Sequence, residues 1–425
     1  MATIRPLSGL RFSPAAGAME NLVAPPYDVI TAEEREELAA KSEHNTVLLT
    51  LPEQLPDDRS KFVKYARSSS LLSEWRREGI LEADQPNIYR YRQEFISPVD
   101  GARLQREAVV CLIKTEPYEK GVVLPHEQTF PKHKEDRLRL LEATGAHLEC
   151  IYGLYEDAAH TTAISLNHVN WQPLVEVDTD DGIHHELART SNLSEITSVC
   201  AAFERERVWI ADGHHRYETA LAYRQSLGEK DALIPEDFMM IALSSMSDPG
   251  LILLPTHRIV PDMPIPLADI EQRLQRRFNT QYMANAELPE TLRNLDQPDV
   301  RVFGIALHGG TGILATMEEP EDAVRMVPGD ASSLLKMLDV TILHEIILKE
   351  FGIEDSAKVE YTRNAQEAID RVRSDPNAVA FLMNPPTIDA MRRIALGGEK
   401  MPQKSTFYYP KLLSGLLFWS FSDFK

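Results

Sequence analysis

The side chains best suited to chemistry are an acid, two histidines and an arginine grouped around a glycine: Asp212, Gly213, His214, His215 and Arg216. Gly213 permits a tight turn after the apolar run 207–211, and the pattern after it predicts a helix over 215–227. The free N–H groups at the start of such a helix attract anions, and the histidines and arginine add donors and positive charge. The segment therefore favours a phosphate-binding site. The alternative is that Asp212 caps the helix and the histidines face solvent.

Two further segments carry residues that suit a phosphate ligand. Around residues 125–137, Glu127 is a candidate base, and Lys134 and Arg137 are candidate phosphate contacts delivered by a mobile loop. The alternative there is the solvated, charged start of a helix. Asp28 follows two prolines, which predicts a rigid loop that presents a carboxylate, although a structural turn explains the same residues.

The second half of the chain adds a smaller set of candidates. His257 and Arg258 end a predicted strand and could face an anion, although a buried, hydrogen-bonded histidine explains the pair equally well. The remaining candidates are Lys404, Ser405 and Thr406. Together they resemble a phosphate grip, a short run of donors that could hold a phosphate, but their spacing is not that of a Walker A loop.

The elements that must position these residues alternate between strands and helices. Strands are predicted at 87–96, 107–115, 207–211 and 378–383, and helices at 60–78, 191–206, 215–227, 267–278, 338–351 and 387–396. Two hairpins are predicted, 238–246 with 251–260 and 301–307 with 312–317. We therefore expect an α/β (α+β) protein with two domains, residues 1–232 and a mixed α/β domain with β-hairpins at 233–425.

Composition narrows the class of protein. The 425 residues carry a formal net charge of -20, which argues against nucleic acid and anionic membranes as partners. The three cysteines form no CxxC pair, so neither a disulfide framework nor a structural zinc site is expected. With no signal-like start and no apolar run of membrane-spanning length, the expected compartment is the cytoplasm and the expected partner is a small-molecule substrate.

Residues 210–220 resemble the box of the ParB/sulfiredoxin superfamily, in which a turn of Gly-His-Arg type opens a helix and binds phosphate. That superfamily includes free serine kinases with an Asp-Gly-His-x-Arg box, matched here by Asp212, Gly213, His214 and Arg216. Nearly the whole chain is also similar to a bacterial and archaeal family, the domain of unknown function one-zero-one-five. The segments that carry this similarity include 24–29, 126–129, 134–138, 211–217, 254–258 and 401–411.

The resemblance implies a ParB/sulfiredoxin-like N-terminal part and a kinase acting on a small hydroxylated metabolite, with free L-serine as the first candidate. Mg²⁺ is expected, and the phosphoryl donor would be ATP, ADP or pyrophosphate. The candidate catalytic residues are Glu127, Asp212, Asp28 and His215. The alternative is a non-catalytic regulatory protein that senses a nucleotide or a phosphorylated metabolite. An enzyme needs a base near an acceptor hydroxyl, whereas a sensor does not.

Overall fold

The computed structural model describes residues 1–129, 131–354 and 358–425, and it divides them into two compact units. The first unit consists of Met1–Pro125, Thr129–Ile252 and Pro410–Lys425, and the second of His126–Gln128 and Leu253–Tyr409. This division differs from the boundary expected near residue 232. Strand β12 (Phe238–Ser245) pairs with β5 (Arg103–Lys114) inside the first unit, so the chain leaves that unit only after β12.

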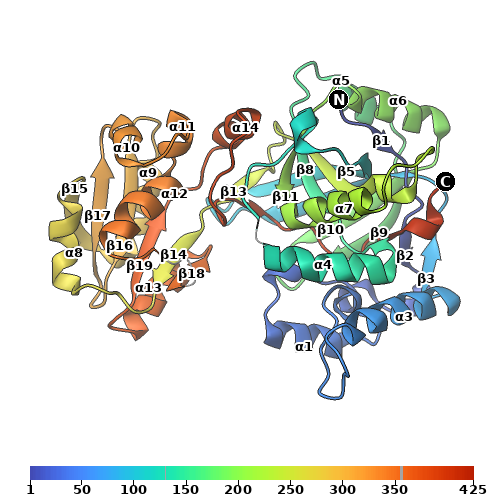
Figure 1. The fold of residues 1–425 in the computed structure, drawn as a ribbon, viewed down its shortest axis with the longest axis horizontal. Helices are drawn as coiled ribbons and strands as arrows, with labels where there is room; N and C mark the ends of the chain where they lie inside the picture. Colours follow the sequence, from blue (N-terminus) through green and yellow to red (C-terminus); the bar gives the residue numbers. More distant parts are fainter. Residues whose placement is uncertain (130, 355–357) are drawn as a thin grey trace. The chain divides into compact units, whose positions relative to one another are not determined.

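A mixed sheet forms the centre of the first unit (Figure 1). Within the described residues it has nine strands in the order β6-β11-β8-β12-β5-β4-β10-β9, with β1 also paired to β5. The bounds of the other strands are β1 (Ile4–Arg5), β4 (Ile88–Ile96), β6 (Val123–Leu124), β8 (Ile151–Tyr155), β9 (Gln172–Asp178), β10 (His184–Thr190) and β11 (Val208–Asp212). The pairs β11–β6 and β12–β8 are parallel and the others are antiparallel. The expected mixed α/β class is confirmed.

Helices and two small strand pairs complete the first unit. The helices are α1 (Ala32–Lys41), α2 (Val47–Thr50), α3 (Val63–Arg77), α4 (Pro131–Thr144), α5 (Thr161–Asn167), α6 (Leu193–Phe203) and α7 (His214–Ser226). The small pairs are β2 (Leu10–Phe12) with β3 (Leu81–Ala83) and β7 (Ala146–His147) with β21 (Trp419–Ser420). Helix α4 packs against both α3 and α7, and Figure 1 shows it between them. This packing fixes α7, which begins at the His-His-Arg segment.

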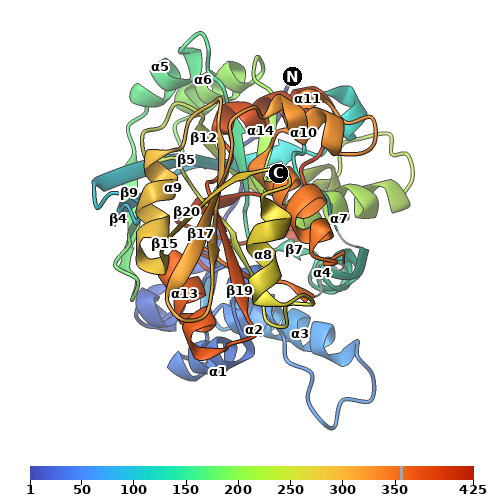
Figure 2. The same ribbon diagram turned by 90° about the vertical axis from the view of Figure 1, so that its left-hand side faces the viewer.

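The second unit is built on an antiparallel sheet in the order β15-β17-β16-β19-β14-β18. Its strands are β14 (His257–Val260), β15 (Asn279–Ala284), β16 (Arg301–Ala306), β17 (Thr311–Met317), β18 (Glu360–Thr362) and β19 (Val379–Met383), and β13 (Ile252–Leu254) pairs separately with β20 (Phe407–Tyr409). Its helices are α8 (Leu267–Leu274), α9 (Leu288–Asn294), α10 (Glu321–Met326), α11 (Ser333–Lys336), α12 (Asp339–Ile342), α13 (Ala365–Ser374) and α14 (Ile388–Leu396). Helices α9 and α13 bury apolar side chains in one core with the sheet. Figure 2 shows both helices beside the sheet.

One predicted hairpin is confirmed and the other is wrong. Strands β16 and β17 pair as expected across the glycine-rich turn. Strand β12 instead pairs with β5 and β8, whereas β14 belongs to the sheet of the second unit. The turn at residues 247–250 docks onto β5, because the Asp248 carboxylate accepts the Glu107 N–H at 3.0 Å. The Asp-Pro-Gly sequence indicated a turn, but a turn does not determine whether the strands on either side of it pair with each other.

None of the helices in the described ranges combines the length and the apolar character that crossing a lipid bilayer requires.

Candidate functional site

The candidate site begins where β11 passes into α7. Strand β11 ends at Asp212, Gly213 adopts a left-handed conformation with φ +92°, and α7 begins at His214. A Cβ atom at Gly213 would lie 2.6 Å from Cγ2 of Ile151, so only glycine fits without a shift of its neighbours. Gly213 occupies the N-cap position of α7 and has no side chain with which to cap it. The predicted sequence of strand, tight turn and helix is therefore confirmed.

Arg216 is the third residue of α7 and is held by three acceptors. Its Nη1 atom donates to the carbonyl oxygen of Cys150 at 2.6 Å and lies 3.9 Å from Oε2 of Glu149. Its Nη2 atom lies 3.6 Å from Oδ2 of Asp212. Burial lowers the pKa of Arg216, but Glu149 and Asp212 raise it further, so the net shift is upward. The Nε atom is buried and makes no hydrogen bond within the described ranges, so it remains available to a ligand oxygen.

Asp212 is the anionic centre of this group. Besides Arg216, the ammonium of Lys411 lies 3.3 Å from Asp212 Oδ1. Burial raises the pKa of Asp212, but Lys411 and Arg216 lower it further, to about 2. Asp212 is therefore ionised at neutral pH. Such a carboxylate is suited to holding a cation, whereas a general base needs a pKa nearer the working pH.

This shift predicts a loss of stability in acid. The folded-state pKa of Asp212 is about 2, below its usual 3.8, so its contribution is present above pH 3.8 and is lost as pH falls toward 2. A shift of this size corresponds to roughly 2 kcal/mol. Urea unfolding measured at several values between about pH 5 and pH 2 gives the free energy of unfolding as a function of pH. This free energy should fall less steeply with decreasing pH in Asp212→Asn than in the wild type. Equal slopes would contradict the ion-paired state of Asp212.

A loop on the other side of Arg216 places Asp28 nearby. The residue before Asp28, Tyr27, lies in a short 3-10 helix (Tyr27–Val29), and its backbone N–H donates to Oε1 of Glu149 at 3.0 Å. The guanidinium carbons of Arg137 and Arg216 lie 4.0 and 5.9 Å from the centre of the Tyr27 ring. Asp28 is exposed and contributes to raising the pKa of Arg216. The loop after the two prolines therefore presents the Asp28 carboxylate near Arg216.

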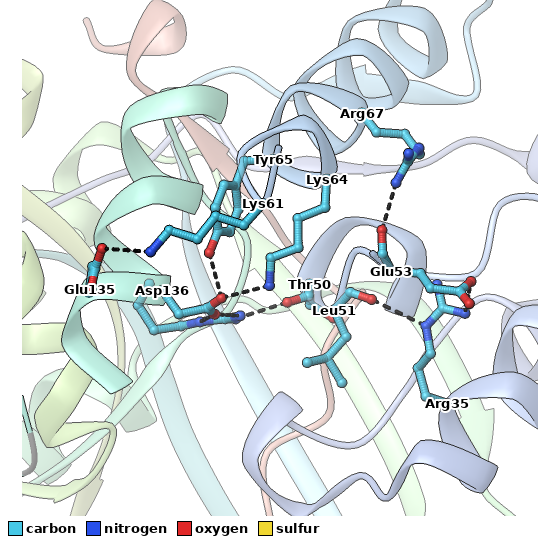
Figure 3. A network of polar contacts seen from close by, with 11 residues as sticks. Arg35, Thr50, Leu51, Glu53, Lys61, Lys64, Tyr65, Arg67, Glu135 and Asp136 are labelled. Carbon is cyan, nitrogen blue, oxygen red and sulfur yellow. Dashed lines mark hydrogen bonds and ion pairs between the residues drawn. The ribbon is translucent and has the colours of Figure 1, made fainter. Parts of the chain in front are cut away.

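Arg137 is held rigidly, which corrects the expectation of a mobile loop. It lies within α4, is 7% exposed, and donates through Nη1 to the carbonyl oxygen of Thr50 at 2.8 Å. Its neighbour Asp136 accepts from Lys64 at 2.9 Å and from the Tyr65 hydroxyl at 2.7 Å (Figure 3). Burial raises the pKa of Asp136, but Arg137, Lys64 and Tyr65 hold it well below its usual range. This network fixes the backbone that carries Arg137.

A cavity of about 50 Å³ lies against these residues. Arg137, His147, Glu149, Arg216 and Thr219 are among its lining residues. The Nε2 atom of His147 and the hydroxyl of Thr219 are buried without a hydrogen-bond partner among the described residues. Burial, assisted by the charge of Arg216, lowers the pKa of His147 to about 4, so its imidazole is neutral. The cavity is large enough for a water molecule, which needs roughly 10–15 Å³ of such a volume.

The structure therefore brings together, in the first unit, four of the predicted site residues: Asp28, Arg137, Asp212 and Arg216. Lys134 also lies in this unit, on α4, where it pairs with Glu218 of α7. His214 is buried at the start of α7, and His215 is half-buried beside it.

Most of the remaining candidates lie in the second unit, where they contact one another. The Glu127 carboxylate accepts the backbone N–H of Lys404 at 3.2 Å and the hydroxyl of Thr406 at 3.4 Å. Ser405 is buried and donates to the carbonyl oxygen of Pro402. Glu127 is thus held in a defined position by the segment that the sequence identified as a phosphate grip.

His257 and Arg258 are buried and hydrogen-bonded, which was the alternative to an anion-binding role for this pair. Arg258 is 1% exposed and donates to the carbonyl oxygen of Lys404 at 3.1 Å, and burial lowers its pKa to about 10. The Nδ1 atom of His257 accepts the backbone N–H of Met383 at 3.3 Å, and burial lowers its pKa to about 4. Both side chains hold β14 in the sheet through contacts with neighbouring backbone.

Two members of the first-unit group were not predicted as site residues. Lys411 lies in a segment that carries the family resemblance, so this position in the sequence could have identified it as a candidate site residue. Glu149 had a weaker signal, a single acid within the apolar stretch 146–155. It is 8% exposed and joins Tyr27, Ser414 and Arg216. An acid in such a stretch needs buried donors, which only the fold identifies.

The described side chains provide no preformed metal cluster. Within residues 1–129, 131–354 and 358–425, no group of three or more His, Cys, Asp or Glu side chains is placed to hold a metal ion. Magnesium at phosphate sites needs fewer protein ligands, because it binds one or two carboxylates together with substrate phosphates. The ionised Asp212 fits that more limited role.

Fold and site together define a mixed α/β protein with a group of paired basic and acidic side chains at the start of a helix. Comparison with family models identifies its family: the chain belongs to the family described as "Protein of unknown function (DUF1015)", whose model matches residues 4–341. No curated protein matches the sequence.

Solved structures resemble the chain only distantly. A free serine kinase variant in complex with ADP shares 14% identity at a TM-score of 0.35, covering 70% of this chain and 87% of the kinase. A conserved hypothetical protein from Pyrococcus furiosus shares 14% identity at a TM-score of 0.34, with coverages of 71% and 92%. SbnI with a C-terminal truncation, from Staphylococcus aureus, shares 11% identity at a TM-score of 0.37, with coverages of 72% and 86%. Similarity at this level does not indicate an activity, so a proposed activity rests on the geometry of the site.

Proposed function

We propose that the protein is a phosphotransferase that moves a phosphoryl group from a nucleotide or pyrophosphate to a hydroxyl group of a small metabolite. The observation that carries the proposal is the grouping of Arg137, Arg216 and Lys411 around the start of α7. Phosphoryl transfer depends mainly on positioned cations and backbone donors around the phosphates. The N–H groups at the start of α7 and the buried Nε donor of Arg216, which has no hydrogen-bond partner among the described residues, would provide such groups.

The residues take the following roles in the proposed reaction. Arg216 and the N–H groups at the start of α7 bind the donor phosphates, and Lys411 keeps Asp212 ionised. Asp212 would hold Mg²⁺, which neutralises phosphate charge when it is bound. The acceptor oxygen forms a bond to the terminal phosphorus, and the bond from that phosphorus to the donor's bridging oxygen breaks. The leaving phosphate keeps the bonding electron pair, and the acceptor's hydroxyl proton passes to a carboxylate.

Asp28 is the proposed base within the first unit. It is exposed and follows Tyr27, whose ring contacts both Arg137 and Arg216, so a ligand on those arginines would lie near its carboxylate. Glu127 remains the candidate base that the sequence suggested first. Both are tested by substitution in the same assay.

Phosphorus NMR of the purified protein tests the proposal directly. We expect one donor among ATP, ADP and pyrophosphate, with Mg²⁺ present, to yield a phosphate ester from L-serine or another small alcohol. L-Alanine is the matched control, because it is L-serine without the hydroxyl group and should yield no ester. Tight binding of a nucleotide without transfer to any alcohol would instead support the sensing protein. Failure of calorimetry to detect binding of any phosphate compound would contradict both functions.

A further inference from the structure

The first unit contains a second cavity, of about 540 Å³, away from the Arg216 group. Its lining includes Tyr155, at the end of β8, whereas Asp212 pairs with Tyr152 near the start of that strand. The rise of about 3.3 Å per residue along a strand places roughly 10 Å between these two positions. Cavities of about 300–1,000 Å³ are typical of small-molecule sites. The volume is therefore sufficient for a metabolite.

One part of the cavity lining is apolar. Val109 and Leu243 come from the sheet, and Leu166 and Val169 from α5 and the residues after it. The Trp171 ring also lines the cavity, with the guanidinium carbon of Arg90 5.6 Å from its centre. This surface would favour an apolar group on the ligand.

Arginines of β4 form a second part of the lining. Arg90 and Arg92 lie two residues apart on the strand and therefore share a face of the sheet. Both pair with Glu186, and Arg92 also donates through Nε to Glu107 at 2.8 Å. The Nε atom of Arg90 is buried and makes no hydrogen bond within the part of the chain that the structure describes. It therefore offers a donor to a ligand oxygen.

Two acids, Asp157 and Asp248, contribute a third part. Asp157 accepts the N–H groups of Thr162 and Ala163 at 3.0 and 2.8 Å. Asp248 accepts those of Glu107 and Gly250 at 3.0 and 2.8 Å. Neither carboxylate forms an ion pair with a Lys or Arg side chain among the described residues. Burial raises the pKa of Asp248, and the charge of Arg106 offsets this shift only in part.

We propose that this cavity binds a free amino acid with an apolar side chain. The ligand carboxylate would accept from Arg90, the ammonium group would lie toward Asp157 and Asp248, and the side chain would cover the apolar surface beside Trp171. A polyanion such as a nucleotide fits less well, because Glu107, Asp157 and Asp248 all line the cavity. The proposal does not depend on the phosphotransferase activity.

Calorimetry on the full-length protein tests the ligand class. L-Leucine and L-phenylalanine are the probes, each compared with the corresponding amine that lacks the carboxylate and the acid that lacks the ammonium. We expect saturable binding of at least one amino acid, and affinity at least about tenfold weaker for both of its analogues. Absence of saturable binding up to about 10 mM would overturn the proposal. Equal affinity for either analogue would overturn it as well.

Substitutions on α5 locate the binding. Ala163→Phe would add bulk to the cavity lining and should weaken binding at least about tenfold. Ile164→Phe is the matched control, because Ile164 lies next along the same helix, is 55% exposed and does not line the cavity. Asp248→Asn is the second variant, in case Ala163→Phe does not fold as judged by circular dichroism, and it too should weaken binding. Undiminished binding in whichever of these two variants folds would overturn the proposed location.

Discussion

Replacing Arg216 with methionine is expected to lower the free energy of unfolding by about 3–5 kcal/mol. The Arg216 side chain is 11% exposed and forms ion pairs with Glu149 and Asp212. Removing one partner of a buried ion pair leaves the other charge uncompensated, which costs more than the pair contributes. Lys411 still offsets Asp212 in the variant, so most of the loss should arise from Glu149. Urea unfolding at neutral pH measures the change.

A double variant separates charge compensation from ligand binding. Adding Glu149→Gln to Arg216→Met removes the uncompensated carboxylate, so it should recover part of the lost stability. It should not restore binding of pyrophosphate, which we assign to the guanidinium. Arg77→Met is the matched control, because Arg77 is 72% exposed, and it should change stability by less than about 0.5 kcal/mol. If Arg216→Met were as stable as this control, the buried charge group would contribute nothing to folding.

Replacing Asp28 with asparagine is expected to reduce turnover by about 10²–10⁴-fold in the proposed phosphotransferase reaction. Asparagine has nearly the shape of aspartate but cannot accept the proton of the acceptor hydroxyl. Donor affinity should change little, because Asp28 does not bind the donor phosphates in the proposed reaction. Single-turnover kinetics for the ester product and calorimetry for the donor give the two quantities separately.

The same assay decides between the two candidate bases. Asp57→Asn is the control, since Asp57 is exposed and has no role in the proposed site. If Glu127→Gln caused the large loss and Asp28→Asn did not, the base would be Glu127, the first choice from the sequence. If both variants kept full turnover, neither carboxylate would be the base.

Local patterns predicted the individual elements well. The tight turn at Gly213 and the helices expected over 191–206 and 215–227 are all present, the helices as α6 and α7. Each depends on residues a few positions apart, which a sequence displays directly. Pairing partners were harder to predict, because the pairing of β12 with β8 joins segments far apart in the chain. The helix expected over 338–351 also differs in detail, since a π-helix (Leu343–Leu348) follows α12.

The candidate site shows the same contrast. The residues of its helix start, Asp212 to Arg216, were evident from their types and order. Glu149 and Lys411 acquire their roles only when β8 and the C-terminal segment lie beside β11. His257 and Arg258 carry the right chemistry for an anion, but burial uses both in backbone contacts. Spacing in a sequence does not reveal which polar side chains are already satisfied.

The return of Pro410–Lys425 to the first unit has a consequence for synthesis on the ribosome. Lys411 pairs with Asp212, and the buried Trp419 lies in β21, which pairs with β7. A nascent chain that has completed the other strands of the first unit therefore still lacks the β7–β21 pair and the Lys411 ammonium beside Asp212. Because translation proceeds from the N-terminus, the second unit is synthesised before these residues emerge. The charge group around Asp212 can therefore be completed only after the whole second unit has been synthesised and Lys411 has left the ribosome.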